Sequence, residues 1–354
     1  LQPSIFPVLR AMQLTLLIPE LLWPEPDDNE TFAGLDLPAL TTLLGRSRLT
    51  RQPATSFDAT LADAFGIASP VPYAALRLLG DGLDPAGHGW ACADPVHLRL
   101  HQERLLLADG STLSIAMAEA TALADELNRH FADLGEFRVA APERWYLRLA
   151  SDAHFDVPPL SEMTGRRLQQ QLPEEKPTAW LRKLLNEAQM LMHLHPTNDA
   201  RTEAGRMTIN SLWLWGPGRL PEQLAAPFDL VCSDDPLALG MARGAGVATQ
   251  APPNGFATLP TGSRHALVVL TELLRAVQYE DVDAWRERMR ALERDWFAPL
   301  LGAVRRGQVT LDLRASTIYG RLCWEATRSD AWKLWKRPQP LQDVARQLSA
   351  GAAA

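Results

Sequence analysis

The sequence predicts an α/β protein with a doubly wound, mainly parallel sheet and an inserted α+β subdomain. Unbroken apolar runs such as LTLLIP (residues 14–19) and FDLVCSD (228–234) are typical of strands buried on both faces. These runs alternate with longer segments of helical periodicity, as parallel strands joined by helices do. The length of 354 residues, 46% of them apolar, allows one large core with an insertion, or two domains.

The first part of the core is predicted over residues 12–80. Its first strand is 14–19, and Met12 just before it is a candidate for the natural start. A helix is predicted to begin near Pro38, because proline favours the first helical position. Residues 55–79 are predicted to be mostly helical, with a break at the SPVP of 69–72.

The inserted α+β subdomain is predicted over residues 88–160. From Trp90 polar and apolar residues alternate, which indicates a half-exposed strand, and RLLLA (104–108) is its predicted partner. A helix over 117–131 and two strands within 137–150 complete the subdomain. The polar, proline-rich segment 151–179 is predicted to be the return linker.

The second part of the core is predicted over residues 178–348. It begins with a helix over 180–195 and a buried strand, Ile209 to Trp215, that ends in a tight turn at Gly216-Pro217-Gly218. In an open α/β sheet such a strand end is where ligands usually bind. The strand at 228–234, a helix at 235–246 and the long segments 264–278 and 281–307 follow.

Overall charge and cysteine content narrow the functional class. A net charge of −7 and a pI near 5.7 argue against a general nucleic-acid or membrane binder, although local basic patches stay open. Three distant cysteines without CxxC spacing indicate neither disulfides nor a zinc site, which favours the cytoplasm. No apolar run approaches the roughly 20 residues of a membrane span, and the first twenty residues make a poor signal peptide.

Polar and aromatic side chains gather between residues 186 and 219, where we predict a ligand-binding pocket. Two arginines there could fork onto a phosphate or carboxylate, whereas the alternative is a set of capping histidines and turn-forming asparagines. His193 and His195 alone are a weak metal signal. We predict no catalytic residue, no metal ligand and no cofactor. The predicted ligand-binding residues are His195, Asn198, Arg201, Asn210, Trp213, Trp215 and Arg219.

Two other constellations have structural interpretations. His97 and His101 lie four residues apart on one strand, which indicates an exposed sheet face rather than a metal site. The tryptophans of LCWEATRSDAWKLWKRP could form an aromatic and basic surface for a partner, but a core position with lysine stems packed around it is the alternative. These tryptophans are Trp324, Trp332 and Trp335.

The segment 186–221, NEAQMLMHLHPTNDARTEAGRMTINSLWLWGPGRLP, resembles the central part of the archaeal-type cofactor-independent phosphoglycerate mutases. Their pattern is a helix, His-Pro-x-Asn and then Asn-x-x-Trp-x-Trp-Gly. The likeness covers roughly residues 14–45 and 181–306. The whole chain, including ADPVHLRL, RWYLRL and NSLWLWG, also resembles bacterial RpfE-type regulators. This resemblance implies an alkaline-phosphatase-like sheet.

The resemblance also implies what the active mutases need, which is two metal ions held by an Asp after the first strand, a Ser nucleophile, and Asp and His ligands including a late Asp-His pair. Here Pro19 and Glu20 follow the first strand, no Asp-His pair occurs, and His265 is the one histidine after His195. We therefore predict a catalytically degenerate, mutase-like cytoplasmic protein with a regulatory role, whose partner is a small phosphorylated ligand or another protein and neither nucleic acid nor a membrane. One alternative is an active phosphomutase or phosphohydrolase rebuilt around Glu20, His195 and Arg201. The other is a structural partner-binding module that uses the 324–335 segment.

Overall fold

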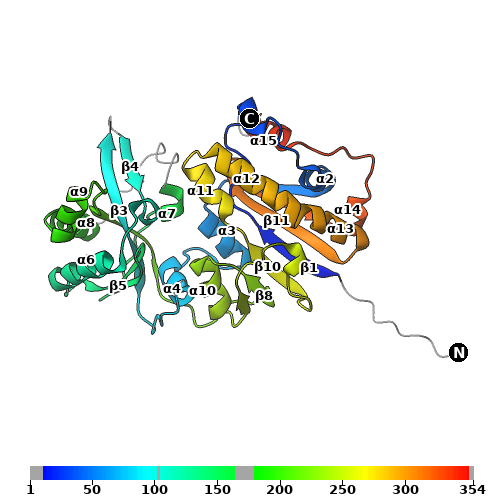
Figure 1. Cartoon of the computed structure of the whole chain (residues 1–354). Helices are drawn as coiled ribbons and strands as arrows, with labels where there is room; N and C mark the ends of the chain where they lie inside the picture. The colour runs from blue at the N-terminus through cyan, green and yellow to red at the C-terminus, as the bar shows by residue number, and fades with distance from the viewer. Residues whose placement is uncertain (1–10, 102–103, 164–178, 351–354) are drawn as a thin grey trace.

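The chain is built around two β-sheets, which lie side by side in Figure 1. The computed structural model describes residues 11–101, 104–163 and 179–350, so the linker predicted over 151–179 lies partly outside the described residues. Of the described helices, none combines the length and the apolar character that crossing a lipid bilayer requires. The larger sheet occupies the right of Figure 1 and the smaller one the left.

The larger sheet has seven strands and is mainly parallel, as predicted. β1 (Met12–Leu17) lies at its centre between β10 and β11, and all three run in the same direction. The antiparallel pairs of this sheet lie at one edge, where β12 pairs with β11 and β2 pairs with β12. The order is β2 (Arg48–Gln52), β12 (Gly320–Ala326), β11 (Val309–Thr317), β1, β10 (His265–Val269), β8 (Leu230–Cys232) and β9 (Ala248–Gln250).

Helices cover both faces of this sheet. Leu14 and Leu16 of β1 pack into a core with α2 (Pro38–Arg46) and α12 (Val282–Leu292), whereas Leu17 packs into a second core with α3 (Phe57–Ala64) and α10 (Pro236–Gly244). Alternate side chains of a strand point to opposite faces, so a strand buried on both faces has to be apolar almost throughout. This explains the unbroken apolar run at residues 14–19.

Shorter elements complete the described chain. The long segment 281–307 is helical, with the turn η3 (Glu293–Phe297) joining α12 to α13 (Ala298–Arg306). This turn is a π-helix, and it lies just before Pro299, which has no N–H to donate to the preceding turn. The remaining elements are α1 (Asn29–Phe32), α5 (Gly110–Leu113), α7 (Leu160–Met163), η2 (Phe256–Thr258), α11 (Glu272–Gln278), α14 (Arg328–Ala331) and α15 (Leu341–Ala350).

The smaller sheet is antiparallel and contains the predicted insertion. Helices α6 (Met117–His130) and α8 (Ala179–His193) contribute Leu123, Leu127 and Leu184 to its core. α9 (Pro196–Glu203) follows α8 directly. The strands are β4 (Arg104–Ala108), β3 (Trp90–His101), β6 (Arg144–Leu149) and β5 (Gly135–Ala141), with β7 (Ser211–Gly218) paired to β3.

The position of β7 corrects the prediction for the strand at 209–215. It does not belong to the parallel sheet, because it pairs with β3 in the antiparallel sense. The tight turn predicted at 216–218 is also wrong, since these residues continue the strand. Gly216 has a φ of +58°, and a Cβ on it would lie 2.6 Å from Cβ of Tyr73. Its backbone therefore passes against the start of α4 (Tyr73–Gly80), where a larger residue does not fit.

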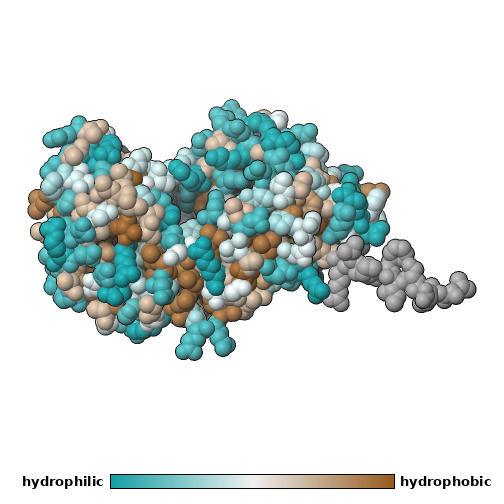
Figure 2. Space-filling view, turned by 60° about the horizontal axis from the view of Figure 1, so that its bottom comes forward, coloured by the Kyte–Doolittle hydropathy of each residue, from teal (hydrophilic) through white to brown (hydrophobic). Residues whose placement is uncertain are grey.

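α4 joins the two sheets, because it packs against β7 and β3 on one side and crosses α10 on the other. Two glycines meet where these helices cross. A Cβ on Gly80 would lie 1.6 Å from the carbonyl oxygen of Pro236, and one on Gly240 would lie 1.7 Å from that of Leu76. Figure 2 shows hydrophobic residues gathered over this middle part of the molecule. The division into folding units at the predicted boundaries stays a prediction.

Candidate functional site

Arg201, one of the predicted ligand-binding residues, is fully buried, and its guanidinium is hydrogen-bonded to other residues of the chain. Its Nε donates to the carbonyl oxygen of Met207 at 2.7 Å, and one terminal nitrogen donates to Oε2 of Glu119 at 2.8 Å. The other terminal nitrogen donates to the carbonyl oxygen of Leu113. Its exposed fraction is 0%, so this guanidinium connects α9 to α5 and α6 and does not face a ligand.

The two predicted asparagines bond to the backbone. Asn198 donates through Nδ2 to the carbonyl oxygens of Met192 and Ile209, at 2.6 and 2.8 Å, and accepts from the N–H of Ile209 at 2.8 Å. Asn210 exchanges two hydrogen bonds with the peptide groups of Leu98, at 2.7 and 2.9 Å. Their amides thereby fix the start of β7 to α8 and to β3. Every donor and acceptor used here is unavailable to a ligand.

The two tryptophans and Arg219 lie apart from these residues. Trp213 donates through Nε1 to the carbonyl oxygen of Pro158 at 2.9 Å, and Trp215 donates to Oδ2 of Asp94 at 2.8 Å. Arg219 is exposed and pairs with Asp152 at 2.8 Å. The structure therefore does not bring the seven predicted residues into one pocket, and ligand binding by them stays a prediction.

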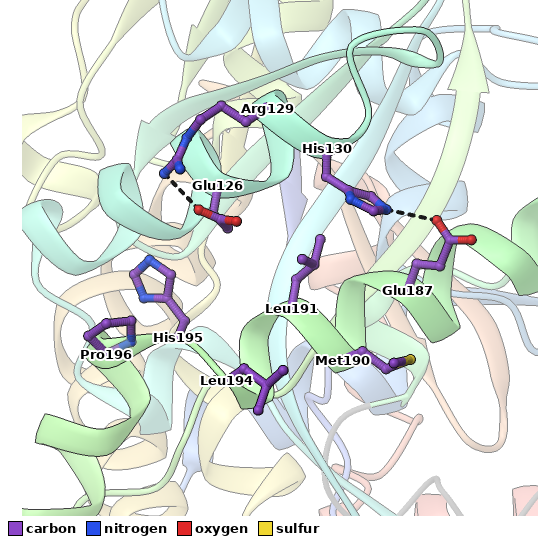
Figure 3. A pocket seen from close by; sticks show the side chains of 9 residues that line it. All are labelled: Glu126, Arg129, His130, Glu187, Met190, Leu191, Leu194, His195 and Pro196. Atoms are coloured by element: carbon purple, nitrogen blue, oxygen red, sulfur yellow. Dashed lines mark hydrogen bonds and ion pairs between the residues drawn. The ribbon is translucent and has the colours of Figure 1, made fainter.

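His195 does line a groove, which lies between α6, α8 and the start of α9 (Figure 3). Its Nδ1 accepts the N–H of Thr197 at 3.2 Å, which places the ring proton of the neutral side chain on Nε2. The groove has a volume of about 530 Å³, within the range of small-molecule sites. The lining residues are Glu126, Arg129, His130, Glu187, Met190, Leu191, Leu194, His195 and Pro196.

Charged pairs form the rim of this groove, and apolar side chains form its floor. His130 Nε2 lies 2.9 Å from Oε2 of Glu187, and Arg129 lies 2.7 Å from Glu126. Figure 3 shows these pairs on either side of Leu191. The α6 side of the groove could not be predicted from the sequence, since nothing in the spacing of Glu126 to His130 indicates that α8 packs beside it.

The fold points to a second place, the carboxyl edge of the parallel sheet, where open α/β sheets bind ligands. Here the exit of β1 is closed by the protein itself. The N–H of Glu20 donates to the carbonyl oxygen of Ser316 at 2.9 Å, and Trp285 donates through Nε1 to the carbonyl oxygen of Glu20 at 3.2 Å. The rings of Trp23 and Trp285 pack at 5.6 Å, and the hydroxyl of Tyr319 donates to the carbonyl oxygen of Trp23 at 2.8 Å.

One of the two carboxylates that follow β8 caps a helix. Oδ1 of Asp235 accepts the N–H of Ala238 at 2.9 Å and so caps α10, while Oγ of Ser233 accepts the N–H of Asp235 at 3.0 Å. This explains why an SDD sequence follows the strand, since such residues satisfy the first N–H groups of a helix.

The mutase resemblance implies a two-metal centre, and the absence of its ligands from this chain stays a prediction. His265 is the first residue of β10, so it lies at the amino edge of the sheet, and its Nδ1 is 2.9 Å from the carbonyl oxygen of Pro227. Within the part of the chain that the structure describes, no group of three or more His, Cys, Asp or Glu residues is placed to share a metal ion. The carboxyl edge instead holds a helix cap and packed aromatic rings.

Buried carboxyl groups at this edge titrate unusually. Burial, together with the neighbouring charges of Asp58 and Asp234, raises the pKa of Asp235 to about 7, although the backbone N–H of Ala238 acts to lower it. Burial also raises the pKa of Asp58, although the hydroxyl of Ser161 donates a hydrogen bond to it. Near neutral pH, Asp235 is thus divided between its charged and neutral forms.

We expect Asp235→Asn to become more stable relative to the wild type as the pH rises from 5 to 8. The folded pKa lies above the unfolded value, so this group stabilises the fold fully below about pH 4, and the contribution is lost as the pH passes about 7. Asparagine keeps the cap without the charge. A shift of this size corresponds to about 4 kcal/mol, but the side chain keeps some solvent contact, so we expect about 1–2 kcal/mol.

Urea unfolding at the two pH values measures this difference. Asp28→Asn is the matched control, because Asp28 also caps a helix but its pKa is lowered by the hydrogen bond from Thr31. It stays ionised throughout this pH range, so its variant should show no comparable trend. A parallel pH dependence of wild type and Asp235→Asn would contradict the prediction.

Comparison with known proteins gives limited sequence matches. No protein-family model matches the chain. It is 31% identical to a 2,3-bisphosphoglycerate-independent phosphoglycerate mutase of Methanosarcina barkeri over 80 residues. This aligned stretch is 22% of this chain and 20% of that protein. It is 35% identical to a probable mutase of the same kind from Geobacter sulfurreducens over 65 residues. This second stretch is 18% of this chain and 16% of that protein. The matches thus span about a fifth of these curated relatives.

Two solved structures align with nearly the whole chain. The PH0037 protein from Pyrococcus horikoshii has a TM-score of 0.53 and 14% identity over 98% of this chain and 99% of that one. A cofactor-independent phosphoglycerate mutase from Thermoplasma acidophilum has a TM-score of 0.47 and 16% identity over 96% and 100%. The chain therefore shares the fold of the PH0037 protein, an α/β fold with a mainly parallel sheet as predicted, and over a limited part of its sequence it is similar to the 2,3-bisphosphoglycerate-independent phosphoglycerate mutases.

Proposed function

We propose that this is a phosphoglycerate-mutase-like protein that no longer carries out metal-dependent phosphoryl transfer and acts by binding. The observation that carries the proposal is the carboxyl edge of the parallel sheet. There the exit of β1 is closed by Glu20, Trp23 and Trp285, and Asp235 caps α10. Two-metal chemistry needs several carboxylates and imidazoles that face one point, and the described residues at this edge offer no such group.

A rebuilt active site is less well supported by the same geometry. Glu20 follows β1 of the larger sheet, Arg201 is bonded inside the smaller one, and His195 lines the groove beside α8. Residues held in separate places cannot act on one substrate, because catalytic groups must lie within hydrogen-bond reach of the reacting atoms. The regulatory role, the RpfE-type relationship and the cytoplasmic location belong to this proposal as well.

The groove at His195 is the proposed binding site for a small phosphorylated ligand. The Nε2–H group of His195 donates to no acceptor among the described residues, so it is free to donate to a ligand. His130 and Arg129 add further donors at the rim of the groove. An imidazole in such a groove can donate to a phosphate oxygen. The apolar floor formed by Leu191 and Met190 suits the uncharged part of a ligand.

The first test asks whether the chain has phosphatase or mutase activity. The metal content of the purified protein is measured, and turnover of 3-phosphoglycerate and of a phosphate ester is followed with Mn²⁺, Zn²⁺ and chelator. The double variant Ser233→Ala, Asp234→Asn serves as the background, since a contaminating phosphatase is indifferent to it. We expect wild type and variant to give the same residual rate. Chelator-sensitive turnover that the variant lacks would refute the proposal.

The second test concerns the groove. Thermal-shift titration with 3-phosphoglycerate and with inorganic phosphate should raise the melting temperature of the wild type but not of His195→Asn, which keeps the cap on Thr197. His193→Asn is the control, because this exposed histidine does not line the groove. An equal shift in all three proteins would remove His195 from the site without affecting the first test.

A further inference from the structure

A group of large apolar side chains is exposed in the loop after α14. The exposed fractions are 55% for Trp332, 68% for Leu334 and 78% for Trp335. Trp324, from the same predicted segment, is by contrast 1% exposed within β12. Trp332, Leu334 and Trp335, together with the basic residues around them, are called the aromatic–basic surface below.

The loop is held in place by two helices that cover the larger sheet, α13 and α2. Nε1 of Trp332 donates to the carbonyl oxygen of Arg305 at 3.2 Å. The N–H of Gln339 donates to the carbonyl oxygen of Thr41 at 2.9 Å. The carbonyl oxygen of Arg337 lies so close to α2 that a Cβ on Gly45 would approach it to 2.2 Å. The exposed side chains are therefore presented on a fixed backbone.

The charge of this surface is opposite to that of the whole chain, which carries −7. Within the residues that the structure describes, the one acid of the loop and α14, Asp330, pairs with Lys333 at 2.5 Å. No described carboxylate forms a salt bridge with the other cations here, although Arg306 donates to Gln308 at 2.9 Å. These cations are Arg305, Arg306, Arg328, Lys336 and Arg337.

We propose that the aromatic–basic surface docks on an anionic lipid membrane. Exposed fractions of 68% and 78% mean that the side chains of Leu334 and Trp335 protrude from the loop. A bilayer accepts protruding side chains without a preformed pocket, and tryptophan is favoured at its interface. The unpaired cations are attracted by the negative surface potential.

Other acidic partners fit this surface less well. A single-stranded nucleic acid gains from stacking on aromatic rings, but Leu334 between the two tryptophans has no stacking face. The prediction that the chain binds no membrane rested on its overall charge, which does not describe this one face. The surface lies at the end of the molecule farthest from the smaller sheet (Figure 1), so docking leaves the groove at His195 open. The inference does not depend on the proposed function.

Vesicle flotation of the full chain tests the proposal. We expect at least about tenfold stronger binding to vesicles with 30% phosphatidylglycerol than to pure phosphatidylcholine, and weaker binding as salt increases. Leu334→Ser with Trp335→Ser should abolish most of the binding, and so should Lys336→Glu with Arg337→Glu. Met190→Ser with Leu194→Ser is the matched control, because these residues are 66% and 75% exposed in the distant groove.

Three results would overturn the proposal. These are the absence of binding, equal binding to neutral and anionic vesicles, and an equal loss of binding in the groove control. Tighter binding to polyglutamate or to single-stranded RNA than to vesicles, abolished by the same loop variants, would assign the surface to another partner. Circular dichroism of each variant checks that the fold is intact, and the charge variant tests the surface independently if the serine variant fails to fold.

Discussion

Arg77→Met is expected to lower the free energy of unfolding by about 3–5 kcal/mol, because it leaves the carboxylate of Asp94 buried without its partner. The guanidinium of Arg77 donates to both oxygens of Asp94, at 2.6 and 2.9 Å, and through Nε to the hydroxyl of Tyr146 at 3.0 Å. It also lies 5.2 Å from the ring centroid of Trp215. The Asp94 side chain is only 1% exposed, so water cannot replace what is lost.

Urea unfolding of three variants checks this result. Arg48→Met removes one partner of an exposed pair with Glu325, whose side chains are 74% and 46% exposed, and should cost under about 1 kcal/mol. The double variant Arg77→Met, Asp94→Leu should be more stable than Arg77→Met alone, since an apolar replacement of a whole buried pair is often tolerated. If Arg77→Met costs no more than Arg48→Met, the buried pair does not have the role assigned here.

Gly240→Ala is expected to destabilise the protein by about 2–3 kcal/mol at the crossing of α4 and α10. Alanine favours a helix by about 1 kcal/mol over glycine, which opposes the effect. The new methyl carbon would lie 1.7 Å from the carbonyl oxygen of Leu76, however, and this atom belongs to the backbone. The helices must therefore move apart, and the steric cost exceeds the gain in propensity.

Gly302→Ala is the matched control for this prediction. The nearest atom to its new methyl carbon is a terminal nitrogen of Arg306 at 3.2 Å, which can rotate away. This variant should be neutral or slightly stabilised in the same unfolding experiment. Gly240→Ala with unchanged stability would mean that the two helices cross with more freedom than the structure indicates.

Much of the architecture could be predicted from apolar periodicity. The run at 14–19 and the run at 228–234 are both in the parallel sheet, and the helix at 117–131 is present almost to the residue. β7 was assigned to the wrong sheet because a buried strand has the same apolar texture in either sheet. Its partner, β3, lies more than a hundred residues earlier in the chain, and nothing in the sequence identifies it.

The hairpin of β11 and β12 was missed although a signal was available. Its first strand, VTLDLRAST, alternates between apolar and polar residues, and Gly320 begins the second strand with a φ of +137°. This alternation is typical of a strand with one face more deeply buried than the other. Unbroken apolar runs, which indicate strands buried on both faces, do not reveal such a hairpin.

The candidate site was harder to predict than the fold. Asn198, Asn210 and Arg201 have the chemistry of ligand contacts, but their hydrogen bonds go to backbone carbonyls and to Glu119. A sequence gives the donors and acceptors of a residue without their partners, so it cannot separate a binding side chain from one that supports a strand. The groove at His195 depends on the packing of α6 beside α8, which is equally absent from residue spacing.

The central place of β1 also affects how this chain is made on the ribosome. Met12 and Gln13 pair with Val309 and His265, so β1 leaves the ribosome almost 300 residues before its neighbour β11. At 5–20 residues per second this interval is roughly 15–60 s. The strands of the smaller sheet, which end at Gly218, are complete well before then. During translation the smaller sheet can thus fold first, while the apolar side chains of β1 stay without their partners in the larger sheet.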